Sequence, residues 1–327
     1  MSIDWKRFKE IIDANQRFLL TSHIRPDCDA LGSELGMARV LRALGKEVVI
    51  VNGHESPPSL AFMDSHGELK ALGKDVQPHE LDGFDVMMVL DTSAWAQLGP
   101  MGDVLKTTTA KRVVLDHHVS SDDLDAEVFR DIQAEATGRL VVEAAEALGV
   151  ELTADMASVL YAAQATDTGW YRYASVTGRA MRIAAELVDA GAVPQEIYSD
   201  LYEQDTLARL NLRGRILARA QTRLDGRLIY TSVLQEDFEE TGAHPSDTED
   251  VINLTLCVTG VEMAVILVWL SKGGYKVSFR SRCDVDCSKL AASFGGGGHK
   301  AAAGASIDAP YNEVLERVLD AVSAAMK

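Results

Sequence analysis

Carboxylate and imidazole side chains follow three short apolar runs in the first half of the sequence. These residues are His23 after the run 18–22, Asp91 after the run 84–90, and Asp116, His117 and His118 after the run 113–115. Apolar runs of this length are typical of buried parallel strands, and ligands bind at the carboxyl ends of such strands. We therefore expect these side chains to meet at one edge of a sheet, where they would have the composition of a metal site.

Three further carboxylates could join that site. Asp27 and Asp29 lie two residues apart on a loop that Pro26 restrains, and Asp167 follows a predicted helix. A simpler explanation is that Asp29, Asp91 and Asp167 only cap helices, a position where aspartate is favoured. The adjacent histidines could likewise be buried core residues. Considered together, however, six side chains could supply two neighbouring metal ions with ligands: His23, Asp27, Asp29, Asp91, His117 and Asp167.

The types of these ligands favour a particular class of ion. Four carboxylates and two imidazoles without a thiolate suit Mn²⁺, with Mg²⁺ or Co²⁺ as alternatives. Two such ions about 3.5–4 Å apart suit phosphoester hydrolysis, because a bridging water becomes hydroxide and both ions stabilise the transition state. The first half of the sequence therefore predicts a phosphohydrolase with two divalent cations.

The elements that must position these residues alternate between strands and helices as far as about residue 190. Predicted strands cover residues 17–21, 47–51, 84–90 and 112–115, and predicted helices cover residues 6–16, 30–44, 137–148, 154–165 and 177–190. Strand–helix–strand units imply a parallel sheet with right-handed crossovers. The pattern predicts an α/β fold whose N-terminal domain, residues 1–189, is a doubly wound, mainly parallel sheet.

A smaller α/β domain is predicted for residues 209–327, joined to the first by a helical linker at residues 190–208. Residues 194–223 have a helical pattern with many charges and few bulky apolar side chains. Beyond them we predict strands at residues 228–233, 263–270 and 275–282 and helices at residues 247–258 and 311–326. Gly273 and Gly274 would form the hairpin turn between the last two strands.

The composition excludes some classes of protein. Hydrophobic residues make up 47% of the 327 residues and charged residues 25%, as in ordinary globular proteins. The net charge of −17 argues against binding of long nucleic-acid duplexes, which needs broad basic surfaces, but allows a small anionic substrate. Residues 1–6 lack the apolar region of a secretory signal, and the longest apolar stretch, residues 261–270, is too short to span a bilayer. The four cysteines fit no zinc pattern, so we expect reduced thiols in a cytoplasmic protein.

A glycine tract in the second half could bind an anion. Residues 295–298 are four glycines, followed by His299 and Lys300. Glycine backbones can turn several N–H groups toward one point, which would form an anion nest. On the preceding predicted strand, side chains alternate between faces, so Ser278, Arg280 and Arg282 share one face. An arginine there could bind phosphate through two hydrogen bonds, although a glycine run can also be a flexible linker.

These motifs together resemble those of the DHH phosphoesterase superfamily. Asp116-His117-His118 is similar to the triplet that names the family, and His23-x₃-Asp27-x-Asp29, Asp91 and Asp167 match its other metal motifs in order. Residues 294–304, preceded by Ser278-Phe279-Arg280-Ser281, resemble the substrate-binding signature of the DHH-associated C-terminal domain. The resemblance covers nearly the whole chain. The length of the chain and the order of its motifs are similar to those of the compact nanoRNase/pAp-phosphatase (NrnA-type) branch.

The resemblance implies roles for individual residues. His23, Asp27 and Asp91 would hold one Mn²⁺, and the other would be held by Asp29, Asp91, His117 and Asp167. His118 would contact the scissile phosphate, and Asp116 would orient an imidazole, so that Asp91, Asp116 and His118 form the catalytic group. The substrate's far phosphate and nucleotide would be bound by Ser278, Arg280, Arg282, Gly296, Gly297, Gly298, His299 and Lys300. Domain closure about residues 190–208 is also expected.

The resemblance also implies substrates and partners. We expect hydrolysis of RNA of two to five residues to mononucleotides, and removal of the 3′-phosphate of 3′-phosphoadenosine 5′-phosphate (pAp). Hydrolysis of cyclic di-AMP or linear pApA is the main alternative. A nucleotide-binding regulator without turnover and a family II pyrophosphatase fit less well, because the ligand set is intact and the glycine–histidine motif is present. A homodimer is plausible by resemblance.

Overall fold

The computed structural model describes residues 3–327, and the chain divides after Gln204 into two compact units. Met1 and Ser2, which begin the stretch where no secretory signal is expected, lie outside the described residues. The division falls inside the segment 190–208 that was predicted as a linker. Most of that segment is helical, since α8 (Pro194–Tyr202) precedes the division and α9 (Leu207–Ala218) follows it.

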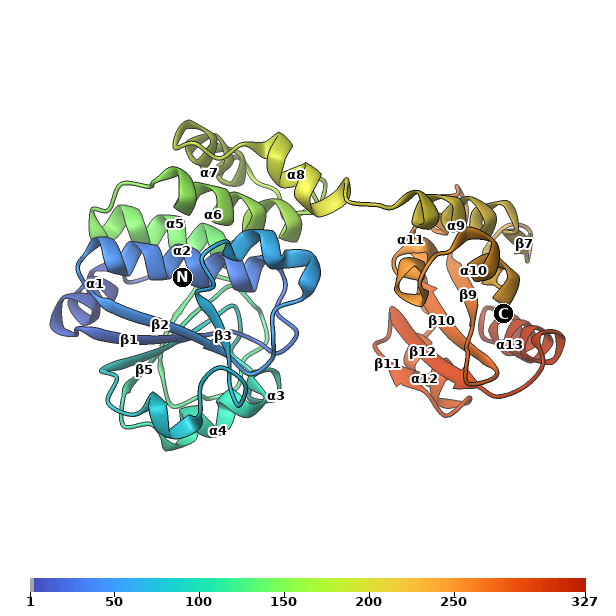
Figure 1. The fold of residues 1–327 in the computed structure, drawn as a ribbon, viewed down its shortest axis with the longest axis horizontal. Helices are drawn as coiled ribbons and strands as arrows, with labels where there is room; N and C mark the ends of the chain where they lie inside the picture. The colour runs from blue at the N-terminus through green and yellow to red at the C-terminus, as the bar shows by residue number, and fades with distance from the viewer. Residues whose placement is uncertain (1–2) are drawn as a thin grey trace. The chain divides into compact units, whose positions relative to one another are not determined.

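The first unit contains a six-stranded parallel sheet, as the sequence predicts (Figure 1). Its order is β3-β2-β1-β4-β5-β6, the reversal of direction that defines a doubly wound fold. The strands are β1 (Arg17–Thr21), β2 (Glu47–Asn52), β3 (Leu69–Ala71), β4 (Val86–Leu90), β5 (Lys111–Asp116) and β6 (Glu127–Arg130). In the centre, Leu19 of β1 pairs with Val49 of β2 and with Met87 of β4. The α/β prediction is therefore confirmed, but the short edge strands β3 and β6 were missed.

Helices cover both faces of this sheet, which explains why its central strands are apolar without alternation. Phe18, Leu20 and Met88 belong to one core with α1, α2, α5, α6 and α7. Leu19 and Met87 point to the opposite core with α3 and α4, as the two layers in Figure 1 show. The bounds are α1 (Trp5–Ala14), α2 (Cys28–Ala43), α3 (Trp95–Leu98), α4 (Pro100–Thr107), α5 (Thr137–Leu148), α6 (Ala154–Asp167) and α7 (Gly178–Asp189), with 3₁₀ turns at Pro58–Asp64 and Pro78–Leu81.

Helices α2 and α6 pack closely because two glycines of α2 face α6. A Cβ atom added to Gly32 would lie 2.4 Å from the carbonyl oxygen of Val159, and one added to Gly36 would lie 2.6 Å from Leu160 Cδ2. This close approach brings the first turn of α2, which carries Asp29, toward the end of α6, which carries Asp167.

The second unit contains a six-stranded mixed sheet of order β11-β12-β10-β9-β8-β7, in which only β8 and β9 are parallel neighbours. The strands are β7 (Gln221–Arg223), β8 (Leu228–Val233), β9 (Met263–Trp269), β10 (Tyr275–Ser281), β11 (Gly297–Gly298) and β12 (Ala302–Ile307). One face packs on α12 (Cys287–Ala292) and α13 (Tyr311–Ala325), and the other packs on α9 and α11 (Val251–Thr255). Helix α10 (Gln235–Thr241) and a 3₁₀ turn at Pro245–Thr248 complete the unit.

Two helix predictions were wrong in this region. Residues 194–223 form α8, α9 and β7 instead of one helix, because Thr206 caps a new helix by accepting a hydrogen bond from the Arg209 N–H. Residues 247–258 contain only the short α11 after the 3₁₀ turn, since Asp250 has a left-handed backbone (φ 64°) that interrupts the helix. Within residues 3–327, no helix is long and apolar enough to cross a membrane.

The packing of α2 on α6 leads to a first prediction. Gly32→Ala should lower the free energy of unfolding of the first unit by about 1–3 kcal/mol, because the new methyl group meets a backbone atom that cannot move aside. Gly214→Ala is the matched control, since α9 leaves open space around Gly214. It should stabilise the second unit by about 0.5–1 kcal/mol. Urea denaturation of the two variants would measure both effects, and equal stability of Gly32→Ala and wild type would contradict the proposed packing constraint.

Candidate metal centre

The carboxyl ends of three adjacent parallel strands carry the predicted ligands. Strands β1, β4 and β5 are neighbours in the sheet. His23 lies two residues after β1, Asp91 directly follows β4, and His117 directly follows β5. Asp91 has a left-handed backbone (φ 62°) and its N–H donates to the carbonyl of Leu115, so the strand end is held in an unusual conformation.

The remaining two sides of the site come from helix ends. Asp27 is the N-cap of α2, where its Oδ1 accepts hydrogen bonds from the N–H groups of Asp29 and Ala30. Helix capping therefore accounts for the position of Asp27. Capping was expected as an alternative role for Asp29, but Asp29 lies inside the first turn of α2 and is not the cap. Asp167 is the last residue of α6, two residues beyond the predicted helix end, and Thr168 occupies the capping position.

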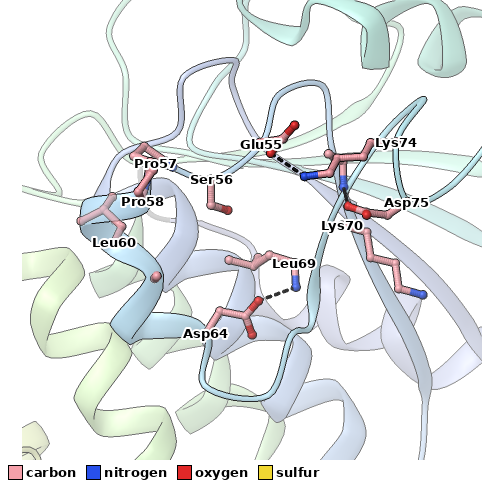
Figure 2. Close-up of a pocket in the computed structure, with 12 residues that line it drawn as sticks. Glu55, Ser56, Pro57, Pro58, Leu60, Asp64, Leu69, Lys70, Lys74 and Asp75 are labelled. Atoms are coloured by element: carbon pink, nitrogen blue, oxygen red, sulfur yellow. Dashed lines mark hydrogen bonds and ion pairs between the residues drawn. The ribbon is translucent and has the colours of Figure 1, made fainter.

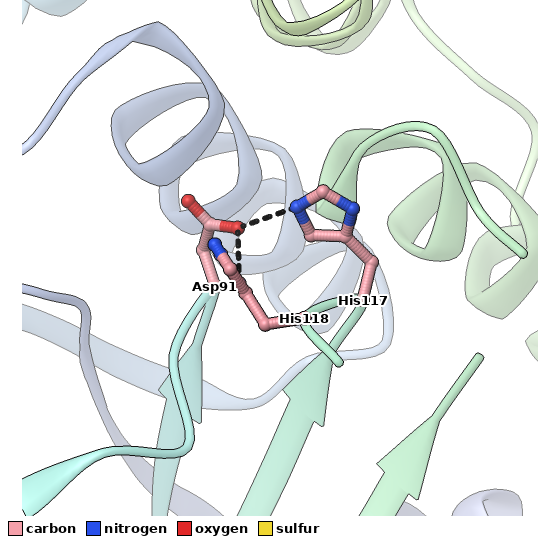
Figure 3. Close-up of side chains that lie close together, drawn as sticks. All are labelled: Asp91, His117 and His118. Carbon is pink, nitrogen blue, oxygen red and sulfur yellow. Dashed lines mark ion pairs between the residues drawn. The ribbon is translucent and has the colours of Figure 1, made fainter. Parts of the chain in front are cut away.

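Asp91 lies at the centre of the assembled side chains. Its Oδ2 is 3.4 Å from His23 Nε2, and its Oδ1 is 3.5 Å from His117 Nε2. Figure 3 shows the Asp91 carboxylate facing the rings of both His117 and His118. Three groups could each hold a metal ion: Asp91 with His117 and His118, His23 with Asp27 and Asp91, and Asp29 with His117 and Asp167. All six residues predicted as ligands belong to these groups.

The N-terminus of α5 fixes two of the carboxylates. Asp29 Oδ2 accepts from the Thr137 N–H at 2.7 Å and Asp29 Oδ1 accepts from the Gly138 N–H at 2.8 Å. The Thr137 hydroxyl donates to Asp91 Oδ1 at 2.8 Å. A helix N-terminus favours negative charge, so the start of α5 offsets part of the cost of burying the Asp29 carboxylate. The sequence analysis noted Thr137 only as a helix start. Its position as N1 of a helix beside a predicted site was the signal that could have found it.

Backbone carbonyls orient the two imidazoles. His117 Nδ1 lies 3.1 Å from the Ala134 carbonyl oxygen, and His23 Nδ1 lies 3.0 Å from that of Ile24. Each contact lets Nδ1 donate to a backbone carbonyl and directs Nε2 toward the carboxylates, so Nε2 is the nitrogen that could ligate a metal. In both residues it is Nε2 that faces the carboxylates.

Asp116 is separate from the cluster and supports His118. Its fully buried carboxylate lies 2.8 Å from His118 Nδ1, and it accepts hydrogen bonds from the His118 N–H and the Ser93 hydroxyl. Burial opposes ionisation of Asp116, but the hydrogen bonds from His118 and Ser93 outweigh it and lower its pKa. The same contact raises the pKa of His118, whose side chain is half exposed.

The centre is strongly acidic. Burial raises the pKa of Asp29, and the neighbouring Asp91 and Asp167 raise it further. Burial also raises the pKa of Asp167, to about 6. Although burial opposes protonation of His23, hydrogen bonds with Asp27 and Asp91 raise its pKa to about 11. Among residues 3–327, only histidines lie within ion-pair distance of the four clustered carboxylates, a composition that could hold a metal ion.

A buried polar network supports the end of β1 beneath the centre. Asn52, at the end of β2, accepts a hydrogen bond from the Ser22 N–H at 3.0 Å, and its side-chain amide donates to Glu34 Oε2 at 2.8 Å. Glu34 is fully buried on α2, and its Oε1 has no hydrogen-bond partner. Burial raises its pKa to about 8, against hydrogen bonds with Asn52 and Ser22 that lower it. None of these residues was recognised in the sequence.

Two cavities open onto the centre. One of about 330 Å³ is lined by Thr92, Ser93, Gln97 and Ser120 together with His23, Asp91 and His118. The other, of about 380 Å³, lies on the side of Asp27, Asp29 and Asp167 and includes Pro57 and Leu60. A third cavity of about 220 Å³ lies apart from the ligands (Figure 2). Lys74 pairs with Glu55 at 2.7 Å, and Asp64 and Asp75 accept backbone hydrogen bonds, so this cavity offers no cluster of carboxylates and imidazoles.

The glycine tract of the second unit differs from the expected anion nest. The N–H groups of Gly295, Gly296 and His299 donate to the carbonyls of Ala292, Ala291 and Ala302, so they are not free to bind an anion. Gly297 and Gly298 form β11, which pairs with β12. Glycine is needed here for close approach: a Cβ atom on Gly296 would lie 2.1 Å from the Gly304 carbonyl oxygen.

Several side chains near this tract remain available to bind an anion. Ser278 and Arg280 share one face of β10 and are partly exposed, opposite Gly304 and Ala302 of β12. His299 and Lys300 are exposed in the turn between β11 and β12. Arg282 lies just beyond β10 and donates to the Leu256 carbonyl oxygen at 2.7 Å, so part of its hydrogen-bonding capacity is used within the fold.

Comparison with known proteins identifies the family. The DHH family N-terminal domain matches residues 17–164, and the DHHA1 domain matches residues 225–327. A Thermus thermophilus protein named bifunctional oligoribonuclease and PAP phosphatase NrnA is 32% identical over 93% of this chain and 88% of its own length. The chain belongs to the DHH family. The resemblance drawn from the motifs, including the NrnA-type branch, is confirmed.

Other relatives of this DHH protein agree. A Bacillus subtilis protein with the same name as the Thermus protein is 27% identical over 88% of each chain. An exopolyphosphatase-related protein from Bacteroides fragilis has a crystal structure that matches with a TM-score of 0.84 at 24% identity. This match covers 98% of the present chain and 94% of the other. At this identity the match shows a shared fold.

The buried network leads to a second prediction. Because the pKa of Glu34 is raised from 4.5 to about 8, the folded state keeps its proton while the unfolded state loses it. The stability that this proton confers is present below pH 4.5 and is lost as the pH rises to about 8. Glu34→Gln mimics the protonated form and does not titrate. The difference in free energy of unfolding between this variant and the wild type should therefore increase in favour of the variant by up to about 1.4 kcal/mol for each pH unit in that window.

The measurement is urea denaturation from pH 5 to pH 9 in chelator, which removes any effect of bound metal. Glu151→Gln, which removes an exposed carboxyl from the same unit, controls for the loss of a charge. Parallel stability curves for Glu34→Gln and wild type would show that Glu34 is ionised in the fold.

Proposed function

We propose that this chain is a metal-dependent phosphoesterase that hydrolyses short RNA oligonucleotides to mononucleotides and removes the 3′-phosphate of pAp. The observation that carries the proposal is the Asp91 carboxylate, which directs one oxygen toward His23 and the other toward His117. A carboxylate so placed suits a bridge between two divalent cations. The relatives named oligoribonuclease and PAP phosphatase align over most of both chains, which supports the same substrate class here.

The donor set fits two ions. His23, Asp27 and Asp91 would hold one ion, and the other would be held by Asp29, Asp91, His117 and Asp167. Oxygen and imidazole donors without thiolate favour Mn²⁺, with Mg²⁺ or Co²⁺ as alternatives. When bound, the ions would activate a water molecule and stabilise the charge that develops on the phosphoryl oxygens. The four carboxylates, which have only histidines as neighbouring cations, would balance the charge of two divalent ions.

The chain's own residues would orient the phosphate. With its pKa raised by Asp116, His118 favours the imidazolium form, in which both ring nitrogens are donors. Nδ1 is bonded to Asp116, so Nε2 would donate to an oxygen of the scissile phosphate and steady its charge. Asp116 would fix the ring without touching the substrate. Asp27 at the cap of α2, and Asp29 through the N–H groups at the start of α5, would be held in place by backbone hydrogen bonds.

The DHHA1 unit would bind the rest of the substrate. Neither cavity at the metal centre is lined by lysine or arginine, so a second phosphate needs cations from elsewhere. His299 and Lys300 are exposed donors in the second unit, and Ser278 and Arg280 are partly exposed donors; all four suit this role. The substrate-binding set would also include Gly296, Gly297, Gly298 and Arg282, the glycines by shaping β11 and Arg282 with its remaining donors.

Asp91→Ala should lower kcat by more than about 100-fold with every substrate, because it removes the residue shared by both proposed ion sites. Loss of a residue that only supports a metal ligand costs about 10–100-fold, so loss of the shared residue should cost more. Steady-state assays with Mn²⁺ and pAp, short RNA, pApA, cyclic di-AMP and pyrophosphate would test this together with the substrate class. Asp103→Ala, which removes an exposed carboxylate of α4, is the control. Failure of the wild type to hydrolyse both pAp and short RNA would refute the proposed function.

Arg280→Ala should raise KM for pAp and short RNA by about 10-fold or more with a smaller change in kcat, since a charged hydrogen bond to phosphate contributes about 1.5–3 kcal/mol. Arg280→Lys should recover part of the affinity, because lysine keeps the charge but not the planar donor pair. Arg317→Ala on α13 is a matched control, as this exposed arginine pairs only with Glu313 among the described carboxylates. An unchanged KM for Arg280→Ala would exclude this face of β10 as the phosphate site.

A further inference from the structure

The turn that follows Asp167 is strained and carries two exposed side chains. Gly169, Trp170 and Tyr171 have consecutive left-handed backbones, with φ of 56°, 57° and 61°. Tryptophan and tyrosine rarely adopt this conformation, because their Cβ atoms crowd the backbone. The next two residues, Arg172 and Tyr173, are exposed. Non-glycine strain of this kind persists only where the surrounding structure enforces it, and such sites are often functional.

Aromatic packing and hydrogen bonds enforce the turn. The Trp170 ring lies 4.9 Å from that of Tyr198 and 5.9 Å from that of Tyr202, and the Tyr171 ring lies 6.0 Å from that of Tyr161. The Trp170 N–H donates to the Ala165 carbonyl at 2.6 Å. These contacts leave the two strained residues partly buried, whereas Arg172 and Tyr173 after them are exposed.

Tyr173 presents a flat aromatic surface. A Cβ atom added to Gly169 would lie 2.5 Å from two atoms of the Tyr173 ring, so the ring rests directly on the Gly169 backbone. The Tyr173 side chain is nevertheless 56% exposed, which leaves ring surface open to solvent. The absence of a side chain at Gly169 is therefore what lets the ring lie there, two residues beyond the proposed ligand Asp167.

Arg172 is held beside it with most of its donors free. Its Nε donates to the Gly169 carbonyl at 2.6 Å, which fixes the plane of the guanidinium. No carboxylate among residues 3–327 lies within ion-pair distance of it. Neither cavity at the metal centre has a lysine or arginine in its lining, so Arg172 is a cation placed close along the chain to a strongly acidic site.

The residues that precede the turn line the second of the two cavities at the metal centre. Thr166 and Asp167, which lead into the turn, line the cavity of about 380 Å³ together with Cys28. An exposed ring and a guanidinium without a carboxylate partner among the described residues, five and six residues beyond Asp167, match the base and the phosphate of a nucleotide.

We propose that Arg172 and Tyr173 form a nucleotide subsite on the first unit, in which Tyr173 stacks on the base next to the scissile phosphate and Arg172 binds the adjoining phosphate. This subsite rests on the proposed function for its substrate, single-stranded RNA of a few residues. It explains how a unit with so few cations near its centre recognises an oligonucleotide. Stacking is tolerant of base identity, so the subsite would select for a nucleotide rather than for a sequence.

The test compares pApApA with the same trinucleotide that has an abasic residue next to the scissile phosphate. Tyr173→Ala and Tyr173→Leu should raise KM for pApApA about 10-fold, in line with base–aromatic stacking, with little change in kcat. Leucine keeps bulk over Gly169 but lacks the ring. Tyr173→Phe should behave as wild type. With the abasic substrate, all four proteins should have similar KM values. An equal increase of KM with both substrates would overturn the stacking role.

Arg172→Ala should raise KM and reduce the slope of log KM against log salt concentration by about one phosphate contact, and Arg172→Lys should restore much of the slope. Arg182→Ala on α7 is the matched control, because this exposed arginine has no carboxylate partner among the described residues. An unchanged salt dependence in Arg172→Ala would overturn the phosphate contact.

A binding assay separates this subsite from the proposed activity. A trinucleotide with 2-aminopurine at the stacked position should be quenched on binding to wild type and Tyr173→Phe in chelator, and not on binding to Tyr173→Leu. Quenching in a wild type that shows no turnover with Mn²⁺ would refute the activity and keep the subsite. Turnover of pApApA with equal quenching by all variants would keep the activity and refute the subsite.

Discussion

Four carboxylates lie within a small volume at one edge of the main sheet of the first unit, where their negative charges repel one another. Asp29 and Asp91 are almost fully buried, and the nearest opposite charges are imidazoles. An isolated buried carboxylate is costly in free energy unless it is hydrogen-bonded or paired. The fold meets part of this cost with the N–H groups at the start of α5 and the hydroxyl of Thr137. The remaining negative charge is what would favour divalent cations at this edge.

The doubly wound topology makes this concentration of charge possible. Because the sheet is parallel, β1, β4 and β5 all end at the same edge, and three chain segments far apart in sequence deliver His23, Asp91 and His117 there. Helix α2 starts and α6 ends at the same place, and the glycines of α2 let the two helices approach closely enough for Asp29 and Asp167 to face His117. The apolar core between the sheet and these helices supplies the stability that the acidic edge does not.

Three of the proposed ligands could be brought together from the sequence because each one follows a local pattern. An apolar run that stops at a charged residue marks both a buried strand and its functional end, which is how His23, Asp91 and His117 were found. The supporting residues leave no such mark. Thr137, Asn52 and Glu34 act through contacts with segments tens of residues away, and an isolated threonine, asparagine or glutamate in a sequence does not reveal its partner. The hydrogen bonds of the glycine tract could not be foreseen for a related reason, since glycine composition cannot tell free N–H groups from those that donate to a neighbouring helix or strand.

The element boundaries failed where tertiary pairing overrode local preference. Strand β12 is rich in alanine and glycine, which have low strand propensity, and it exists because β10 pairs with it along its whole length. The break between α8 and α9 contains neither glycine nor proline. Its one signal was Thr206, a good N-cap in the middle of a helical pattern.

Backbone strain is concentrated around the acidic edge. Eight non-glycine residues of the described chain have positive φ, and four of them flank the proposed ligands: Arg25, Asp91, Trp170 and Tyr171. In Arg25 and Asp91 the strain sits on the strand-end loops themselves, so these loops bend sharply enough to turn His23 and the Asp91 carboxylate toward each other. In Trp170 and Tyr171 it reverses the chain directly after Asp167. Left-handed turns of this kind direct the backbone away from the site directly after a proposed metal-binding residue. The space beside the carboxylates therefore stays open for a substrate.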